Sequence, residues 1–367
     1  MSDRHDSEGA PPGVPPQSPR WPAAKPEPRE SRGVAFVVAI FLGILLIASA
    51  GLNVLLLVVS VGSMAGGGLG SVDTQYERVH FGGERNAQQT VLRIAIHGAI
   101  AETSSPLLGA AGGTVSLVER ALRQAREDRV AGVLLDIDSP GGGVTDSDEI
   151  YQLLRRFRAE HPEIAVAALF GDIAASGGYY VAAAAERIFA RRTTITGSIG
   201  VIMSSWNFAK LAETYGVQEI AIKSERTPFK DMLSSMRPMR ADERALLTGI
   251  VDELFDQFVD VVDEGRANLD RAQVLQAATG AVYTAAQAKT LGLVDEIGGL
   301  ETVTAWFEQK LGGKVEIVEL RRRPGLGDLL FGGPAASSSG AGSSNLAERL
   351  LHGSTGPRFL YFWQGGR

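Results

Sequence analysis

Hydrophobic residues form one long block near the start of this chain and a series of short blocks after it. No charged residue lies between Arg32 and Asp73, and residues 34–61 within that stretch are almost wholly apolar. A helix of this length reaches about 42 Å at ~1.5 Å per residue, more than the ~30 Å hydrocarbon core of a bilayer. Cleaved signal peptides have a shorter apolar region and a shorter charged leader. We therefore expect one uncleaved transmembrane helix over residues 33–62.

The short hydrophobic blocks alternate between two patterns. Continuous apolar runs of strand length lie at Thr90–Ile96, Val130–Ile137, Ile164–Phe170 and Glu219–Ile222. Apolar residues recur at helical spacing in Thr114–Glu127, Val144–Ala159 and Asn207–Tyr215. A longer helix is expected from Ala241, with an apolar stripe that fits a core or a subunit contact. This alternation is typical of βαβ units and predicts an α/β fold with a largely parallel sheet, in one domain over residues 88–320.

Three segments lack such blocks and are expected to be flexible. They are a proline-rich tail over residues 1–32, a glycine-rich linker over residues 63–87 and a C-terminal tail over residues 321–367. The last of these contains the aromatic cluster Phe359–Trp363. Because an exposed aromatic cluster usually docks on something, three docking sites stay open: a partner subunit, the membrane or a substrate groove.

Charge and composition narrow the function. The formal net charge of −6 and a pI near 5.5 argue against nucleic acid as a partner. The chain has no cysteine, which excludes thiol catalysis and cysteine-containing zinc sites, and we expect neither a metal nor a cofactor. Five basic residues precede the apolar block, and the next one is Arg78. The positive-inside rule therefore places the N-terminus in the cytoplasm and the following domain outside the cell membrane.

One serine stands where a substrate could reach its hydroxyl. Ser176 follows the predicted strand Ile164–Phe170 and precedes an apolar helix, Tyr179–Ala185, with Gly177 and Gly178 directly after it. Glycines at this place allow a sharp turn or the close approach of a substrate. Free N–H groups at the start of the helix would suit a developing oxyanion. A helix-capping serine is the alternative interpretation.

A serine nucleophile needs a base to take its proton. Among the five histidines only His97 ends a predicted strand, and because nothing in the sequence supplies its acidic partner we favour a structural role for it. Lysine is then the expected base. Lys230 lies between Phe229 and Met232, an apolar setting that would lower its pKa if the loop is buried. Lys223 has more polar neighbours and is the alternative.

Several motifs follow one another along the chain between about Thr90 and Leu320. They are Asp138-Ser139-Pro140-Gly141-Gly142-Gly143, Ala174-Ala175-Ser176-Gly177-Gly178-Tyr179-Tyr180, Thr196-Gly197-Ser198-Ile199-Gly200-Val201, Phe229-Lys230-Asp231, Tyr283-Thr284 and Leu291-Gly292-Leu293-Val294-Asp295. Together they resemble the bacterial signal peptide peptidase A family, also called protease IV. The loop from Lys223 to Lys230 departs from the family pattern, since it is about two residues longer and has Phe229 where a tyrosine is common.

The resemblance implies a membrane-anchored serine protease with a Ser/Lys dyad and a crotonase/Clp-protease-like superhelical fold. Carried over to the matching positions, it implies Ser176 as nucleophile, Lys230 as general base and Ser198 as the residue that orients the lysine amine. The oxyanion would be held by the N–H groups of Gly142 and Gly177. The resemblance also implies a homo-oligomeric ring, in which Lys230 of one subunit completes the site of its neighbour.

The expected substrates are hydrophobic peptides, namely signal peptides and other exported segments that a membrane-tethered protease meets. Small residues around Ser176 favour cleavage beside small or aliphatic side chains. Two other functions stay open. One is a catalytically inactive membrane scaffold of the same fold, against which the presence of both Ser176 and Lys230 counts. The other is a crotonase-like acyl-CoA enzyme, which commonly uses a pair of carboxylates that this sequence does not show.

Overall fold

The computed structural model of the protein describes residues 32–65, 76–101, 113–322 and 359–362. Two compact units divide the chain, Met1–Asp73 and Thr74–Arg367. The first contains helix α1, Arg32–Ala65, which includes the helix expected over residues 33–62. Within α1, Phe36–Val54 is apolar and long enough to cross a membrane, and its side chains are not buried by the protein. The proline-rich tail lies outside the described residues, except for Arg32.

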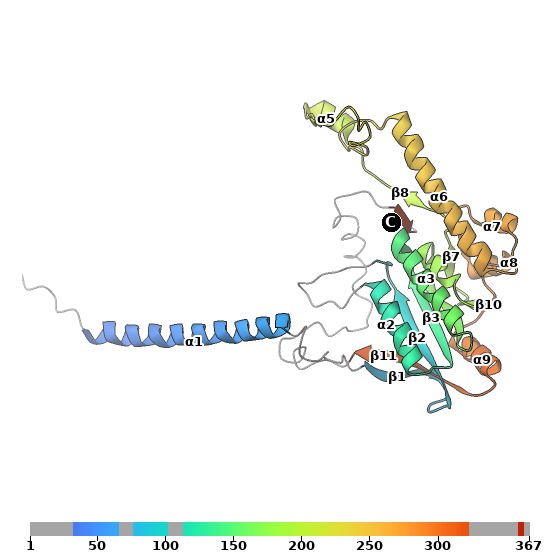
Figure 1. Ribbon diagram of the computed structural model, residues 1–367, viewed down its shortest axis with the longest axis horizontal. Helices are drawn as coiled ribbons and strands as arrows, with labels where there is room; N and C mark the ends of the chain where they lie inside the picture. The colour runs from blue at the N-terminus through green and yellow to red at the C-terminus, as the bar shows by residue number, and fades with distance from the viewer. Residues whose placement is uncertain (1–31, 66–75, 102–112, 323–358, 363–367) are drawn as a thin grey trace, which may run out of the picture. The chain divides into compact units, whose positions relative to one another are not determined.

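A twisted sheet of nine strands forms the centre of the second unit (Figure 1). Its main path runs β1-β11-β2-β3-β5-β6-β10, and all neighbours along this path are parallel except the antiparallel pair of β1 and β11. The strands of this path are β1 (Tyr76–Gly83), β2 (Gln89–His97), β3 (Gly132–Ser139), β5 (Ala165–Ala175), β6 (Arg187–Ala190), β10 (Glu296–Ile297) and β11 (Val315–Arg322). The largely parallel sheet confirms the predicted α/β class.

Helices cover both faces of this sheet. They are α2 (Thr114–Glu127), α3 (Val144–Glu160), α4 (Gly177–Ala182), α6 (Ala241–Gly265), α7 (Arg271–Ala277), α8 (Ala285–Thr290) and α9 (Leu300–Leu311). Alternate residues of β2 and β3 enter two separate cores: Leu92 and Val133 pack in the core with α2, α3 and α6, whereas Val91 and Leu134 pack with α9 on the other face. Burial on both faces explains why these strands read as continuous apolar runs.

The carboxyl ends of β3 and β5 meet at one edge of the sheet, where several short elements gather. There β7 (Ile195–Gly197) pairs with β5 and with β9 (Val282–Thr284). A second sheet of three strands has the order β4-β12-β8, formed by β4 (Gly141–Gly143), β12 (Phe359–Phe362) and β8 (Ile202–Met203). Strand β1 lies within the segment expected to be a linker, and β12 within the segment expected to be a flexible tail. Both form because partner strands distant in sequence pair with them.

The segment between β8 and α6 differs from the prediction. Glu219–Ile222 does not form the expected strand, and the helix expected over residues 207–215 is α5, Ala209–Tyr215. In Figure 1, α5 lies beyond the sheet, near the far end of α6. A strand needs a neighbour for its N–H and C=O groups, and the described part of the chain places none beside this segment. As a result Ile220 and Ile222 are 85% and 97% exposed.

Candidate active site

Ser176 occupies the turn between β5 and α4 in a backbone conformation that is rare for a side-chain-bearing residue. Its φ of 54° and ψ of −117° bring the chain from strand to helix within one residue. Two hydrogen bonds hold this conformation: the Ser176 N–H donates to the Gly197 carbonyl (2.8 Å), and the Ser176 carbonyl accepts from the Tyr180 N–H (2.9 Å). A nucleophilic serine on a strained strand-to-helix turn is a recurrent arrangement in hydrolases. The helix-capping alternative fails, because the hydroxyl makes no capping hydrogen bond.

The Ser176 side chain is buried and unengaged. The residue is 1% exposed, yet its hydroxyl makes no hydrogen bond to any other part of the chain that the structure describes. Because the fully buried side-chain atoms left without a partner in the described residues are Gln89 Oε1 and Arg187 Nε, the Ser176 hydroxyl keeps a small accessible surface. A free hydroxyl at a strained turn is suited to act on something that binds there.

Two glycine amides lie together beside this turn. Gly177 is the first residue of α4, so its N–H has no acceptor within the helix. A Cβ on Gly177 would lie 3.1 Å from the Gly142 nitrogen, and a Cβ on Gly141 would lie 2.7 Å from the Gly177 nitrogen. Only residues without side chains permit this approach. The Gly141 N–H donates to the Ser139 hydroxyl at 3.1 Å, whereas Gly142 lies opposite Tyr361 in the ladder of β4 and β12, and its role as an oxyanion donor stays a prediction.

Serine side chains that the sequence analysis did not single out support this glycine turn. The Ser139 hydroxyl, fully buried, accepts from the Gly141 N–H, and the Ser147 hydroxyl donates to the Gly143 carbonyl at 2.8 Å. A serine one turn into a helix is common, so only the fold reveals that Ser147 fixes the end of β4.

Ser198 lies close to Ser176 through the pairing of β5 and β7. Gly197, which accepts from the Ser176 N–H, directly precedes it. Ser198 is buried at 7% exposure, has a φ of 51°, and is held by a hydrogen bond from its N–H to the Ala281 carbonyl at 2.7 Å. The fold thus brings Ser176, Ser198, Gly142 and Gly177 to one place, and the orienting role of Ser198 stays a prediction.

Neither candidate lysine reaches this place within the single chain. Lys230 lies on the exposed segment between α5 and α6, and within the described residues no contact engages its Nζ. The burial that its apolar neighbours suggested is therefore not found in one copy of the chain. Lys223 donates to the Pro228 carbonyl at 2.8 Å and pairs with Asp231.

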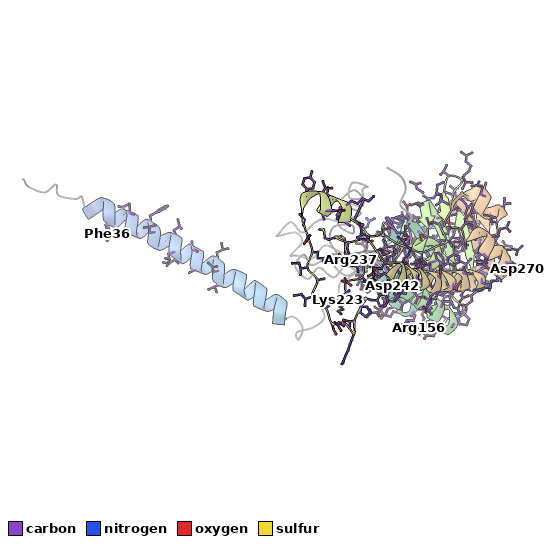
Figure 2. The ribbon with its side chains drawn as sticks, turned by 90° about the horizontal axis from the view of Figure 1, so that it is seen from above. Phe36, Arg156, Lys223, Arg237, Asp242 and Asp270 are labelled. Carbon is purple, nitrogen blue, oxygen red and sulfur yellow. The ribbon has the colours of Figure 1, made fainter. Side chains whose placement is uncertain are left out.

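The two lysines differ in the partners that their amines contact. Figure 2 labels Lys223 and Arg237 on the stretch of chain that precedes α6. The hydrogen bond from Lys223, together with Arg237, lowers the pKa of Asp231 to about 2. An amine that donates to a carbonyl and pairs with a carboxylate uses its protons structurally, whereas a general base must offer a lone pair. Lys230, with no described partner, is the better candidate.

His97 has an acidic partner that the sequence analysis did not foresee. Its Nε2 lies 3.5 Å from Asp136 on the neighbouring strand β3. Burial raises the pKa of Asp136, but hydrogen bonds and charge from His97 and Arg93 outweigh it, so the pKa lies below its usual value. Arg93 also pairs with Glu319 on β11. The group ties three strands together, in keeping with the structural role expected for His97.

The described residues contain no group of three histidine, aspartate or glutamate side chains placed to hold a metal ion. Asp138, three residues before the glycine turn, accepts a hydrogen bond from the Ile173 N–H at 3.1 Å and so supports β5.

Comparison with known proteins places this geometry in a family. The family model described as Peptidase family S49 matches residues 158–314, which include Ser176, Ser198 and Lys230. "Putative protease slr0021" of Synechocystis sp. is 37% identical over 268 residues, which cover 72% of this chain and 91% of that protein. "Serine protease SPPA, chloroplastic" of Arabidopsis thaliana is 34% identical over 268 residues, 70% of this chain and 37% of that longer protein.

Among solved structures, a mutant of the 1510-N membrane-bound stomatin-specific protease aligns with a TM-score of 0.40 at 15% identity, covering 60% of this chain and 84% of that chain. The sequence matches alone establish the relationship, because one relative above 30% identity is covered almost end to end. They agree with the resemblance drawn from the motifs. The chain belongs to peptidase family S49, the serine proteases that include signal peptide peptidase A and protease IV.

Proposed function

We propose that the protein is a membrane-anchored serine endopeptidase that cleaves hydrophobic exported peptides, signal peptides among them, through a Ser/Lys dyad. The observation that carries the proposal is the state of Ser176: an unbonded hydroxyl on a largely buried residue at a strained turn, with the amides of Gly142 and Gly177 alongside. An inactive scaffold has no use for a serine held in a costly backbone conformation.

The reaction follows from these groups. The Ser176 hydroxyl attacks the carbonyl carbon of a peptide bond while the neutral Lys230 amine takes its proton. The two glycine N–H groups hold the negative oxygen that forms. The lysine then gives its proton to the leaving amine, and water hydrolyses the acyl ester on Ser176. Ser198 keeps the amine directed at the serine.

Lys230 must be uncharged to act, and an ordinary lysine with a pKa of about 10.4 is almost fully protonated at pH 7. Burial favours the neutral amine. Since Lys230 is exposed in the single chain, a second copy of the chain is the proposed source of that burial. The stretch between β8 and α6, which includes Lys230, supports this, because its side chains Trp206, Tyr215, Ile220 and Ile222 are all at least 75% exposed. Large apolar patches of this kind mark interaction surfaces.

The proposed location follows from α1 and the charges around it. The apolar stretch Phe36–Val54 fits a single-pass membrane anchor. Five basic residues lie on its N-terminal side, and the next basic residue after it is Arg78. The positive-inside rule then puts the N-terminus in the cytoplasm and the catalytic unit on the extracytoplasmic side, where exported peptides are found.

The test compares full-length chains in detergent on casein and on a synthetic signal peptide. Ser176→Ala and Lys230→Ala are each expected to lower kcat/KM by about 10³-fold or more, because either one removes a member of a unit that acts together. Lys223→Ala is the matched control, since it removes a lysine of the same segment and should change the rate only a few-fold. Trapping of a fluorophosphonate on Ser176 reports the nucleophile directly.

A mixing experiment tests whether the dyad is shared between copies. Inactive Ser176→Ala and Lys230→Ala chains are dissociated, mixed in equal amounts and reassembled. About a quarter of wild-type activity is expected to return if each site takes its serine and its lysine from neighbouring subunits of a symmetric ring. Activity that survives in both single variants would overturn the dyad, and no recovery on mixing would place both residues in one chain.

A further inference from the structure

One arginine ties the segment that carries Lys230 to the amino end of α6. The Arg237 guanidinium contacts two carboxylates, Asp231 in that segment and Glu243 in the first turn of α6. Its Nε donates to Asp231 at 3.2 Å, and its Nη1 donates to Glu243 at 3.0 Å. Its Nη2 also donates to the Asp231 carbonyl at 2.9 Å. These three residues, Asp231, Arg237 and Glu243, are called the ionic clasp below; Figure 2 labels Arg237 near Asp242 at the start of α6.

Glu243 is the fixed end of the ionic clasp. Its side chain is completely buried. Besides Arg237, it accepts a hydrogen bond from the Arg240 N–H at 2.9 Å and lies 3.1 Å from the Arg240 guanidinium. The hydrogen bond from Arg237 outweighs the effect of burial and lowers the pKa of Glu243 to about 2. The carboxylate therefore stays charged near neutral pH, and a charge-assisted contact to the arginine fork is strong and directional.

Both chain neighbours of Lys230 are held in place. On one side, the Arg240 guanidinium lies over the Phe229 ring, 5.6 Å from its centroid, and donates to the Pro228 carbonyl at 3.1 Å. On the other side, Asp231 is held by the ionic clasp. The Lys230 amine, by contrast, makes no hydrogen bond or ion pair with the described part of the chain. The contacts thus fix the backbone at Lys230 and leave its amine available.

Helix α6 connects the ionic clasp to the region of the nucleophile. Phe258 of α6 is fully buried against Tyr180 of α4, with 4.9 Å between ring centroids. Helix α4 begins directly after Ser176. Phe258 lies eighteen residues beyond Arg240, the N-cap of α6, which is about 27 Å along a helix. The ionic clasp therefore holds Lys230 far along α6 from its own chain's serine, as a base that serves a neighbouring copy requires.

We propose that the ionic clasp positions the general base: Arg237, held by the buried Glu243, fixes Asp231 and with it the direction in which the Lys230 side chain leaves the segment. This rests on the proposed function, in which Lys230 takes the proton of Ser176, and deepens it by naming what holds the base. Asp231, Arg237 and Glu243 are positioning residues, because they act through Lys230.

The first experiment separates catalysis from binding in the full-length oligomer, on a fluorogenic signal peptide. Arg237→Ala and Glu243→Gln are each expected to lower kcat about 10²-fold, since a misplacement of about 1 Å has an effect of that size. KM is expected to change less than about threefold, because the substrate contacts are intact. Arg237→Lys keeps the charge but cannot hold both carboxylates in one fork, and is expected to lose roughly tenfold in kcat.

Two matched controls remove members of exposed ion pairs. Arg271→Ala breaks the pair with Asp260, and Glu264→Gln, at the far end of α6, breaks the pair with Arg155. Both are expected to keep the wild-type kcat. Light scattering is expected to show the wild-type oligomer for the variants of the ionic clasp and for the controls.

The pH profile is the second measurement. A general base acts only when it is neutral, so kcat/KM falls on the acid side of its pKa. A lysine that loses its buried position is solvated, and its pKa returns toward about 10.4. The acid limb of Arg237→Ala is therefore expected to move to higher pH by about one unit or more.

The carboxylates of the ionic clasp do not contribute to that limb. The pKa values of Asp231 and Glu243 are each about 2. The other charged groups at the ionic clasp are Lys223 and Arg240, with Asp242 paired to Arg240. They are unchanged in every variant.

Amine labelling measures Lys230 without catalysis. The rate at which acetic anhydride acetylates Lys230 is followed by mass spectrometry over a range of pH, in the assembled Ser176→Ala oligomer. Because only the neutral amine reacts, this rate gives the pKa of Lys230. Adding Arg237→Ala is expected to raise that pKa by about one unit or more, and adding Arg271→Ala is expected to leave it unchanged.

The outcomes separate the inference from the proposed function. If cleavage depends on Ser176 and Lys230 but the variants of the ionic clasp keep kcat and the acid limb, the inference fails and the proposed function stands. Loss of kcat with an unchanged acid limb, or in parallel with dissociation, would assign the ionic clasp to folding or assembly and overturn the inference as well. If the labelling shift is found without any Ser176-dependent cleavage, the proposed function fails and the control of Lys230 by the ionic clasp stands.

Discussion

At the scale of single residues, two buried serines have a positive φ, which is more usual for glycine. Ser176 has a φ of 54° and Ser198 a φ of 51°. Non-glycine residues in such conformations cost on the order of 1–3 kcal/mol and persist where function requires them. Of the five non-glycine residues with a positive φ in the described part of the chain, two are therefore the serines that the motifs placed in the site.

Replacing Ser176 by glycine should release this strain. Glycine has no Cβ to oppose a φ of 54°, so Ser176→Gly is expected to be more stable than Ser176→Ala by about 1 kcal/mol. Ser116, inside helix α2, is the control position, where glycine should be about 1 kcal/mol less stable than alanine. Urea unfolding of the four variants measures both differences. If the glycine variant were less stable than the alanine variant at both positions, the backbone strain at Ser176 would be contradicted.

The sequence indicated some of the site at this scale and not the rest. Two glycines after Ser176 correctly indicated a sharp turn, but no pattern shows that the serine itself takes the left-handed conformation. The family resemblance already favoured Gly142 over Gly141 as an oxyanion donor, and the structure adds that the Gly141 N–H donates to the Ser139 hydroxyl. The setting of Lys230 could not be foreseen, because an apolar neighbourhood in sequence does not say which surface, or whose, will cover the loop.

At the scale of elements, prediction succeeded where burial shapes the pattern. The helix expected over Thr114–Glu127 has those bounds in the structure, and the strands β2, β3 and β5 follow the expected apolar runs. It failed for Glu219–Ile222, an apolar run without a partner strand, and it missed β1 and β12, whose pairing depends on residues far away in sequence. Hydrophobic periodicity indicates which residues are buried, but it does not predict which strands distant in sequence will pair.

The motif that ends in Asp295 also receives a structural explanation. Arg266, at the end of α6, is 3% exposed in its side chain and pairs with Asp295 at 2.7 Å, while also donating to the Gly292 carbonyl. Asp295 further accepts from the Ile188 N–H at 2.7 Å. One carboxylate thus joins the end of α6 to strand β6.

Removing that carboxylate's charge should weaken the fold. Asp295→Asn leaves the Arg266 guanidinium buried without a counter-charge and is expected to cost about 3 kcal/mol. The neighbouring variant Glu296→Gln is the matched control, because the Arg187–Glu296 pair is about 40% exposed and should contribute less than about 1 kcal/mol. Urea midpoints of both variants provide the measurement, and equal losses would refute the special role of Asp295.

The same pair predicts a pH dependence. Burial raises the pKa of Asp295, but the hydrogen bond and charge of Arg266 outweigh it, so the folded-state pKa lies below the ordinary value. A lowered carboxyl pKa stabilises the fold above the unfolded-state value of about 3.9 and loses this contribution as the pH falls below it. Between pH 6 and pH 3 the free energy of unfolding should therefore fall more steeply for wild type than for Asp295→Asn.

At the scale of the whole molecule, the exposed segment before α6 is the proposed contact between copies. Ile222 is 97% exposed, so a charge there costs nothing in the single chain but opposes burial in an interface. Ile222→Asp is expected to dissociate the oligomer and to lower proteolysis together with it, as measured by light scattering and casein cleavage. Leu275→Asp, on an exposed position of α7, is expected to leave both unchanged. Loss of activity without dissociation would contradict the shared site.

The pairing of β1 with β11 brings together the first and last residues of the main sheet. Tyr76, the first residue of β1, lies opposite Arg322, the last residue of β11. The polypeptide therefore enters and leaves the main sheet at one corner, through two strands that already hold each other. A body with adjoining entry and exit points can be spliced into a surface loop of an unrelated carrier. The main sheet should accordingly keep its strand pairing when residues 76–322 are inserted into a host protein through the two chain ends at this corner.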